Sequence, residues 1–372
     1  MNRPYPIPYC LNVHPGSDWK AVRRALSIHA LAVKKIVAPD RPFPLSLHLG
    51  YRSALELASP RRLTAFRGWL KEHDCFVAGI NAFPFGSFHA ASVKAAVYRP
   101  DWRSPDRRAY TLLVARLLAA LIPEGATATL TTVPGGWQSD WKTAAAARQA
   151  LANLARAAQG CRDLSQSAGR RIRIAIEPEP GCAWKLFDPR LDTLGPEICW
   201  CLDTCHAAVD FRSIENLDWR RIGRVQLSAA IECDNTPEAR KALAPFAKPV
   251  YLHQTCAALD GEIIGVWPDL APALRALPKL PRNAIVRTHC HVPLTWAGAG
   301  PLRSTRENLS PGFLRQARKT FCEVETYTYS VLPRALRPRP LARAIAGELE
   351  WASARYGASS STKRKTVSPG LA

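Results

Sequence analysis

Short apolar runs rich in β-branched residues alternate along the chain with longer segments whose apolar residues recur at helical spacing. Two strand-like pieces, residues 250–254 and 285–291, lie between the last two main runs. The main runs, which we predict to be the strands of one sheet, are residues 9–14, 45–49, 76–81, 127–133, 173–177, 198–203, 224–228 and 322–329.

The segments between these runs predict helices. Residues 107–121 and 143–167 have the longest helical patterns. Ser17, Ser59 and Ser104 stand where helices are expected to begin, and their hydroxyl groups can cap a first helical turn.

The alternation of strands and helices predicts a mainly parallel sheet with right-handed crossovers. Eight such units in about 330 residues fit a closed (β/α)8 TIM barrel. A doubly wound sheet would show the same alternation, but no G-x-G-x-x-G follows the first strand and no phosphate-binding G-x-x-x-x-G-K-[ST] occurs. We therefore predict a barrel domain over residues 1–356, ending in a helix at 341–356, and a disordered basic tail over residues 357–372.

The composition is that of a globular protein, with 47% hydrophobic and 22% charged residues. No apolar run approaches the ~20 residues that cross a bilayer. The first residues lack the apolar core of a signal peptide, so we expect a cytoplasmic protein. The 11 cysteines are dispersed and several lie in apolar runs, so we interpret them as free thiols.

The net charge of +21 favours phosphate-bearing partners, which are nucleic acid, phosphorylated metabolites or an anionic membrane surface. Arginine outnumbers lysine by 38 to 13, and alanine is abundant. Compositional drift in a GC-rich genome explains the same charge, and we favour this explanation. Weak contact of the basic tail with a membrane surface remains an alternative.

Most histidines follow the predicted strands. Functional groups of a TIM barrel project from the carboxyl ends of its strands. Seven of the 9 histidines lie within or just after a predicted strand: His14, His48, His89, His206, His253, His289 and His291. We expect His89 and His253 to belong to the wall of a substrate pocket.

Carboxylates show the same distribution. Glu177 ends an apolar strand, and Glu179, two residues later, faces the same side if the backbone stays extended. A buried carboxylate is costly unless it is paired or bound to a cation. The alternative is a pair of loop acids beside Arg173 or Lys185.

The segment ICWCLDTCHAAVDF places Asp203 at the end of a strand and His206 three residues later. An aspartate oxygen and an imidazole nitrogen at this spacing can reach one ion or one substrate. The alternative is that Asp203 caps the following helix and His206 is merely exposed.

Two late strands carry paired polar side chains. His289 and His291 form an H-x-H pattern that points both imidazoles to one face, a common way to supply two metal ligands, although an exposed edge strand would also carry it. Glu323 and Glu325 likewise share a face. Because two inward acids are hard to explain by packing, we assign Glu325 a ligand or base role.

These motifs resemble the xylose-isomerase-like TIM-barrel superfamily, which includes sugar isomerases, ketose 3-epimerases and AP endonuclease IV. Members of that superfamily hold a metal through a Glu, an Asp, a His and a Glu on strands 5 to 8. The resemblance implies Glu177, Asp203 and Glu325 as ligands here. The DTCH segment is similar to that of endonuclease IV, in which both the Asp and the His bind zinc.

The strand-7 position holds Gln226 in place of the histidine. Glutamine is a poor ligand for zinc but acceptable to magnesium or manganese. Either Gln226 completes the set or His253, His289 or His291 takes its place. The cofactor we expect is therefore a divalent ion: Mn, Mg or Zn.

A closer resemblance covers most of the chain. YCLNVHPG, INAFPFGSFH, EPEPGC, DTCHAAVDF, VQLSAA and EVETYTYSVLP together are similar to the EboE-type metabolite traffic proteins. These proteins are encoded in bacterial gene clusters linked to moving or processing a secondary-metabolite precursor. The resemblance implies a small-molecule substrate within such a pathway.

The sequence thus supports a metal-dependent sugar isomerase or epimerase acting on a small polyhydroxylated or phosphorylated metabolite. Glu177 and Glu325 would exchange a proton with the substrate, and His206 would orient a substrate oxygen. Glu179, His289 and His291 would also contact the substrate. The alternatives are an endonuclease IV-like phosphodiesterase, for which His48 and His89 would supply extra ligands, and a carrier without catalysis.

Overall fold

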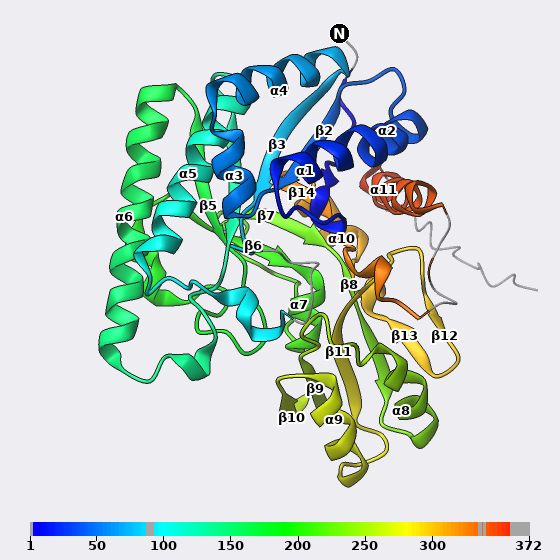
Figure 1. Ribbon diagram of the computed structural model, residues 1–372. Helices are drawn as coiled ribbons and strands as arrows, with labels where there is room; N and C mark the ends of the chain where they lie inside the picture. Colours follow the sequence, from blue (N-terminus) through cyan, green and yellow to red (C-terminus); the bar gives the residue numbers. More distant parts are fainter. Residues whose placement is uncertain (1–2, 87–92, 334–336, 338–339, 358–372) are drawn as a thin grey trace, which may run out of the picture.

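A computed structural model describes residues 3–86, 93–333, 337 and 340–357. Within these residues, eight parallel strands form one sheet in the order β1-β2-β3-β4-β5-β6-β7-β14 (Figure 1). The strands are β1 (Tyr9–Cys10), β2 (Phe43–His48), β3 (Cys75–Asn81), β4 (Thr127–Thr132), β5 (Arg171–Ile176), β6 (Ile198–Asp203), β7 (Ile222–Leu227) and β14 (Phe321–Val324).

The sheet curls round on itself, because β14 pairs with β7 and also lies beside β1. Strands β2, β6 and β7 are buried along nearly their whole length, as expected of parallel strands that are covered on both faces. The architecture is that of a (β/α)8 TIM barrel, as the sequence predicted.

Helices cover the outside of the barrel (Figure 1). They are α1 (Trp19–Ala25), α2 (Leu31–Val37), α3 (Tyr51–Leu57), α4 (Pro60–Glu72), α5 (Pro105–Leu121), α6 (Ala144–Ala168), α7 (Thr204–Val209), α10 (Pro311–Ala317) and α11 (Leu341–Gly357). Short 3-10 helices are η1 (Leu11–Val13), η3 (Lys94–Tyr98), η4 (Gln138–Asp140), η5 (Pro189–Leu194), η6 (Ala244–Phe246), η7 (Leu277–Lys279), η8 (Thr305–Asn308) and η9 (Thr328–Ser330), and η2 (Leu26–Ala30) is a π-helix.

The predicted helix starts are correct in part. The Ser104 hydroxyl accepts a hydrogen bond from the Asp106 amide at the start of α5. Ser59 precedes α4, but its side chain makes no capping hydrogen bond. The prediction for Ser17 is wrong by one residue, because the carboxylate of Asp18 accepts the Ala21 amide instead.

A second sheet between β7 and β14 was not anticipated as a sheet. Within the described residues it has six strands in the order β10-β9-β11-β8-β13-β12, and all its pairings are antiparallel. It consists of β8 (Ala229–Asp234), β9 (Thr255–Leu259), β10 (Glu262–Trp267), β11 (Ile285–Val292), β12 (Gly298–Ala299) and β13 (Leu302–Ser304), with helices α8 (Pro237–Leu243) and α9 (Leu270–Ala276). It lies beside the barrel, below it in Figure 1.

The strand predicted at residues 250–254 is wrong, whereas that at 285–291 corresponds to β11. Residues 250–254 instead cross to the pocket, where the Lys94 ammonium donates to the carbonyl of Tyr251 at 2.8 Å. The runs predicted at 9–14 and 322–329 also stop early, at Cys10 and Val324. After Cys10 the chain forms the 3-10 helix η1, which carries Asn12 to the pocket. After Val324 an irregular segment carries Tyr327 to the pocket, just before η9 begins at Thr328.

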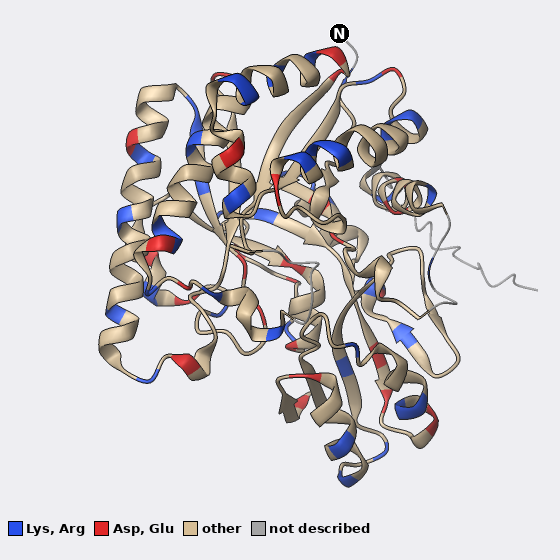
Figure 2. Cartoon of the chain, viewed as in Figure 1, with Lys and Arg blue, Asp and Glu red and all other residues tan. Residues whose placement is uncertain are grey.

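All 11 cysteines are buried free thiols, which confirms the interpretation from sequence. Among the described residues, no helix combines the length and apolarity that a bilayer span requires. The predicted tail lies outside the described residues, apart from Gly357 at the end of α11. Figure 2 shows the positions of charged residues along the helices and the second sheet, with both signs interspersed.

Candidate metal centre at the barrel mouth

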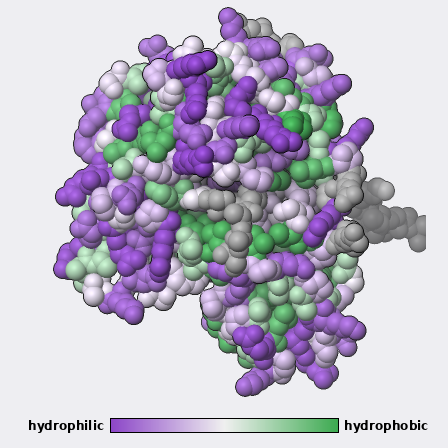
Figure 3. Space-filling view, viewed as in Figure 1, coloured by the Kyte–Doolittle hydropathy of each residue, from purple (hydrophilic) through white to green (hydrophobic). Residues whose placement is uncertain are grey.

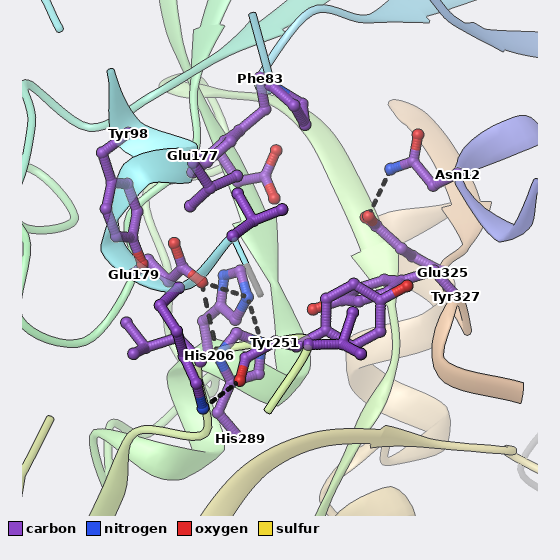
Figure 4. A pocket seen from close by; sticks show the side chains of 16 residues that line it. Asn12, Phe83, Tyr98, Glu177, Glu179, His206, Tyr251, His289, Glu325 and Tyr327 are labelled. Carbon is purple, nitrogen blue, oxygen red and sulfur yellow. Dashed lines mark hydrogen bonds and ion pairs between the residues drawn. The ribbon is translucent and has the colours of Figure 1, made fainter. Parts of the chain in front are cut away.

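A pocket of about 580 Å³ lies where the strands of the barrel end and meet the second sheet. Figure 3 shows apolar side chains gathered in the middle of this face of the molecule. Figure 4 shows polar groups converging inside the pocket. Its lining comprises Asn12, Phe83, Pro84, Val93, Lys94, Val97, Tyr98, Glu177, Glu179, His206, Val250, Tyr251, Leu252, His289, Glu325 and Tyr327.

Three carboxylates meet at this pocket. Glu177 follows β5, Asp203 ends β6 and Glu325 follows β14. One oxygen from each lies within 4.8 Å of an oxygen of the other two, and all three side chains are buried. They meet because the carboxyl ends of parallel barrel strands open onto one face. The structure thus brings together the three residues that the sequence resemblance implied as ligands.

Asp203 uses its two oxygens differently. Oδ1 accepts hydrogen bonds from the His206 amide at 2.9 Å and from the Ser228 hydroxyl at 2.7 Å. Asp203 therefore caps helix α7, as the alternative from the sequence held, but His206 is buried rather than exposed. Oδ2 is also buried, and no described residue donates a hydrogen bond to it.

Glu325 likewise has a described hydrogen-bond donor at only one of its two carboxylate oxygens. Its Oε1 accepts a hydrogen bond from the Asn12 amide group at 2.5 Å, whereas no described group donates to the buried Oε2. Burial first, and then the neighbouring carboxylates, raise the pKa of Glu325 and of Glu177 well above the ordinary range. Among the described residues, no lysine or arginine forms an ion pair with Glu177, Asp203 or Glu325.

Three histidines lie next to the carboxylates. His206 comes from α7, and His289 and His291 come from β11 of the second sheet. The Nε2 atom of His289 lies 3.1 Å from Nε2 of His206 and 3.0 Å from Nε2 of His291. The predicted H-x-H face is therefore buried and turned towards the barrel, not exposed on an edge strand. Asp203 joins the two groups, since its Oδ2 lies 4.0 Å from His291 Nε2.

Burial disfavours the charged form of these imidazoles. Desolvation is the largest cause that lowers the pKa of His206, to about 4, and the pKa of His289 falls well below its usual value for the same reason. His206 and His291 add to the effect on His289.

Glu179 faces the histidines, not the other carboxylates. Its Oε1 lies 3.8 Å from His206 Nε2 and 3.4 Å from His289 Nδ1. Burial is the largest cause of its raised pKa, which is about 7, against the lowering effect of hydrogen bonds from Tyr98 and Gln254. Neither Glu177 nor Glu179 is a loop acid paired with Arg173 or Lys185.

Other predicted site residues do not join these groups. Both amide atoms of Gln226 are engaged inside the barrel, with Cys201 Sγ donating at 3.1 Å and Asn81 Oδ1 accepting at 3.3 Å. Metal ligation by Gln226 would require these bonds to break, and its ligand role stays a prediction. His253 lies 3.6 Å from a carboxylate oxygen of Asp269 and does not line the pocket.

His48, at the end of β2, belongs to none of the potential metal-binding groups among the described residues. His89 lies outside the described residues. Glu323, which faces inward two residues before Glu325, pairs with Arg224 inside the barrel.

Sequence reasoning missed Asn12, Tyr98, Gln254 and Tyr327, which contact the pocket carboxylates or histidines or line the pocket. Asn12 and Tyr327 lie in the second halves of the runs predicted as strands at residues 9–14 and 322–329, which is a signal that could have identified them. Tyr98 and Gln254 carry no such signal, because their approach to Glu179 depends on how the second sheet packs on the barrel.

The fold and the site together define a TIM barrel with buried carboxylates and histidines clustered at its mouth. No protein-family profile and no curated protein matches the chain. It is similar in structure to a xylose isomerase domain protein from Alicyclobacillus acidocaldarius subsp. acidocaldarius, with 13% identity and a TM-score of 0.44 over 88% of this chain and 94% of that chain.

Two further similar structures are the IolI protein with a binding zinc atom and the probable 3-DHS dehydratase AsbF from Bacillus anthracis. The first has 11% identity and a TM-score of 0.46 over 94% of this chain and 96% of that one. The second has 12% identity and a TM-score of 0.46 over 92% and 97%, respectively. Similarity at this level carries no functional argument, and the barrel is assigned from the strand order and pairing of the chain itself.

Proposed function

We propose that the protein is a metal-dependent enzyme of the isomerase or epimerase kind that acts on a small polyhydroxylated metabolite. The observation that carries the proposal is the meeting of Glu177, Asp203 and Glu325, which are buried and form no ion pair with a described lysine or arginine. Three carboxylates so placed repel one another unless protons or a cation neutralise them.

The donor set fits a divalent cation. Asp203 Oδ2 and Glu325 Oε2 are buried oxygens to which no described group donates a hydrogen bond. Carboxylate oxygens suit magnesium and manganese best, and zinc also accepts them. Glu177, Asp203 and Glu325 would hold the ion, while Asn12 and Ser228 orient two of the carboxylates through their outer oxygens.

A divalent ion bound there would polarise a substrate carbonyl and its neighbouring hydroxyl group. Glu177 and Glu325 would move the proton between the two carbons, because each lines the pocket and each has a pKa raised by burial. Tyr327 and Tyr98 line the same pocket.

The pocket wall favours a neutral substrate over a phosphorylated one. Lys94 is the one cationic side chain among the described lining residues. Its ammonium lies 2.6 Å from an Asp269 carboxylate oxygen and also donates to the carbonyls of Lys248 and Tyr251, so it is not free for a phosphate. The context of a secondary-metabolite pathway is supported by the sequence resemblance alone.

Metal analysis and solvent exchange test the proposal. Protein purified without chelator should carry stoichiometric divalent metal, and with Mn²⁺ it should incorporate solvent deuterium next to the carbonyl of a neutral ketose. Glu177→Gln should abolish the exchange. Glu197→Gln, which removes a carboxylate paired with Arg162 away from the pocket, is the matched control and should leave it intact. Absence of stoichiometric metal from the wild-type chain would overturn the proposal.

The same experiment separates the alternatives. Binding of a sugar without deuterium exchange would support a carrier. Cleavage of abasic-site DNA, lost in Asp203→Ala, would support a phosphodiesterase, but the position of His48 outside the potential ligand groups of the described residues does not favour it.

A further inference from the structure

We infer that the substrate carries an apolar body, such as an aromatic ring, beside the carbonyl and hydroxyl groups that the carboxylates take. The inference narrows the substrate class and rests on the proposed function. Nine of the 16 described residues that line the pocket are apolar or aromatic. Most of them come from other segments of the chain than the carboxylates and histidines do. The pocket therefore offers a substrate two chemically different surfaces.

Two connecting segments form an apolar wall of the pocket, which consists of Val93, Val97, Val250 and Leu252. Val97 belongs to η3, which begins directly after Val93, and the other two residues precede β9 of the second sheet. The Val93 amide donates a hydrogen bond to the Val250 carbonyl at 3.2 Å, so the two segments are joined through their backbones. The wall is thus a built part of the fold.

Lys94, the one cationic residue of the described lining, fastens this wall and offers nothing to a substrate. Its ammonium group has three N–H donors. They reach the carbonyls of Lys248 at 3.1 Å and Tyr251 at 2.8 Å and a carboxylate oxygen of Asp269 at 2.6 Å. All three donors are used within the chain, and none remains for a substrate hydroxyl group.

Two tyrosine hydroxyl groups of the pocket are also engaged within the chain. The Tyr98 hydroxyl accepts a hydrogen bond from the Gln254 amide group at 3.0 Å and is hydrogen-bonded to Glu179. The Tyr251 hydroxyl is hydrogen-bonded to Ser330. Both tyrosines therefore contribute their rings to the pocket more than their polar ends.

Two pairs of aromatic rings border the pocket, and Figure 4 labels all four residues. The rings of Phe83 and Tyr98 lie 5.9 Å apart with an interplanar angle of 64°, and those of Tyr251 and Tyr327 lie 5.2 Å apart at 83°. Rings in this edge-to-face arrangement attract further aromatic groups at their faces and edges. An aromatic substituent of the substrate would find such partners here.

The division of the lining decides which kind of substrate fits. A hydroxyl group that is buried against Val97 or Leu252 without a hydrogen-bond partner is costly, whereas an apolar group gains by leaving water. A sugar with hydroxyl groups along its whole length would place some of them on the apolar wall. A compound with its hydroxyl groups at one end and an apolar body at the other avoids this cost.

Two probes test the inference on the full-length chain. 2-Hydroxyacetophenone and dihydroxyacetone are both neutral α-hydroxy ketones, and only the first bears an aromatic ring. We expect titration calorimetry to give about tenfold or more tighter binding of 2-hydroxyacetophenone, because only its ring is buried on the apolar wall. With Mn²⁺ present, solvent deuterium should enter its CH₂ group with a higher kcat/KM than for dihydroxyacetone.

A paired substitution probes the wall itself. Val97→Thr/Val250→Thr replaces a methyl group with a hydroxyl group at two half-buried positions, with little change in shape. It should weaken binding of 2-hydroxyacetophenone about tenfold and change that of dihydroxyacetone less than about twofold. Val266→Thr makes the same change on β10, at a residue that is 62% exposed and outside the pocket, and should alter neither value.

The outcomes separate this inference from the proposed function. Equal or tighter binding of dihydroxyacetone, binding of neither probe, or an unchanged affinity for 2-hydroxyacetophenone in the double variant overturns the apolar body. Deuterium exchange into dihydroxyacetone would still support the enzyme. Binding of 2-hydroxyacetophenone that the double variant weakens, without exchange into either probe, supports the apolar body and overturns the isomerase. Circular dichroism confirms folding, and Val97→Thr alone replaces the double variant if the latter does not fold.

Discussion

Two glutamates at the end of β14 show two ways of burying a carboxylate in one barrel. Glu323 and Glu325 are separated by a single residue, and both side chains are buried. Glu323 receives hydrogen bonds from the Arg224 guanidinium at 2.5 and 2.9 Å, in a layer where both side chains are 0% exposed. Arg224 also donates to Ser46 on β2, so the charges of this layer are paired within the chain.

One layer closer to the barrel mouth, the buried carboxylates have no such arginine partner among the described residues. Glu325 meets Glu177 and Asp203, and the neutral amide of Asn12 is the only hydrogen-bond donor that the described side chains offer to it. Inside the barrel, the chain neutralises Glu323 with an arginine. No described arginine or lysine forms an ion pair with Glu325, Glu177 or Asp203, and this contrast supports the proposed cation from solution.

The largest expected change in the free energy of unfolding comes from breaking the ion pair of Arg224 and Glu323. Arg224→Met leaves Glu323 buried without its counter-ion and should lower the free energy of unfolding by about 3–5 kcal/mol. Urea unfolding measures the loss. The double variant Arg224→Met/Glu323→Leu should recover most of it, because it removes the isolated charge as well. Equal stability of wild type and Arg224→Met would contradict the contrast between the two layers.

A third kind of buried carboxylate gives a pH effect of similar size. Glu348 on α11 accepts hydrogen bonds from neutral groups only: the Leu294 amide and the Thr326 hydroxyl, each at 2.7 Å, and the Tyr329 hydroxyl. Burial is the main cause that raises its pKa from 4.5 to about 7.

Because the folded state holds this proton more tightly than the unfolded state, its stabilising contribution is complete below pH 4.5 and is lost as the pH rises through about 7. The shift corresponds to about 3 kcal/mol. Unfolding measured from pH 4 to 8 in wild type and Glu348→Gln should show a smaller decline in the variant. Parallel curves would show that Glu348 is ionised in the folded state.

The smallest expected change in stability comes from binding of Mn²⁺ at the carboxylates of the barrel mouth. Mn²⁺ at a hundredfold excess over its dissociation constant should raise the free energy of unfolding of the metal-free chain by about 2.7 kcal/mol. Asp203→Asn should abolish this shift, although asparagine can still accept the His206 amide and cap α7. Glu348→Gln is the control that should keep the shift. A shift of equal size in Asp203→Asn would place the ion elsewhere.

The strand positions and the three mouth carboxylates could be predicted from sequence, because both depend on local information. An apolar run predicts a buried strand wherever it occurs, and the barrel rule places Glu177 and Asp203 together once their strands are known. The strand predicted at residues 198–203 matches β6 at both ends. The sheet formed by β8 to β13 could not be predicted in this way, since the pairing of short strands depends on partners distant in the chain.

The tertiary structure alone decided which polar groups meet. No local pattern distinguishes Glu323 from Glu325, yet the packing of β7 against β14 gives the first an arginine and gives the second no ion pair with a described residue. The acceptors that orient His206 and His291 are backbone carbonyls, which every residue carries and no residue type reveals. The sequence determined which side chains reach the mouth of the barrel, and long-range packing determined their partners and therefore their charge.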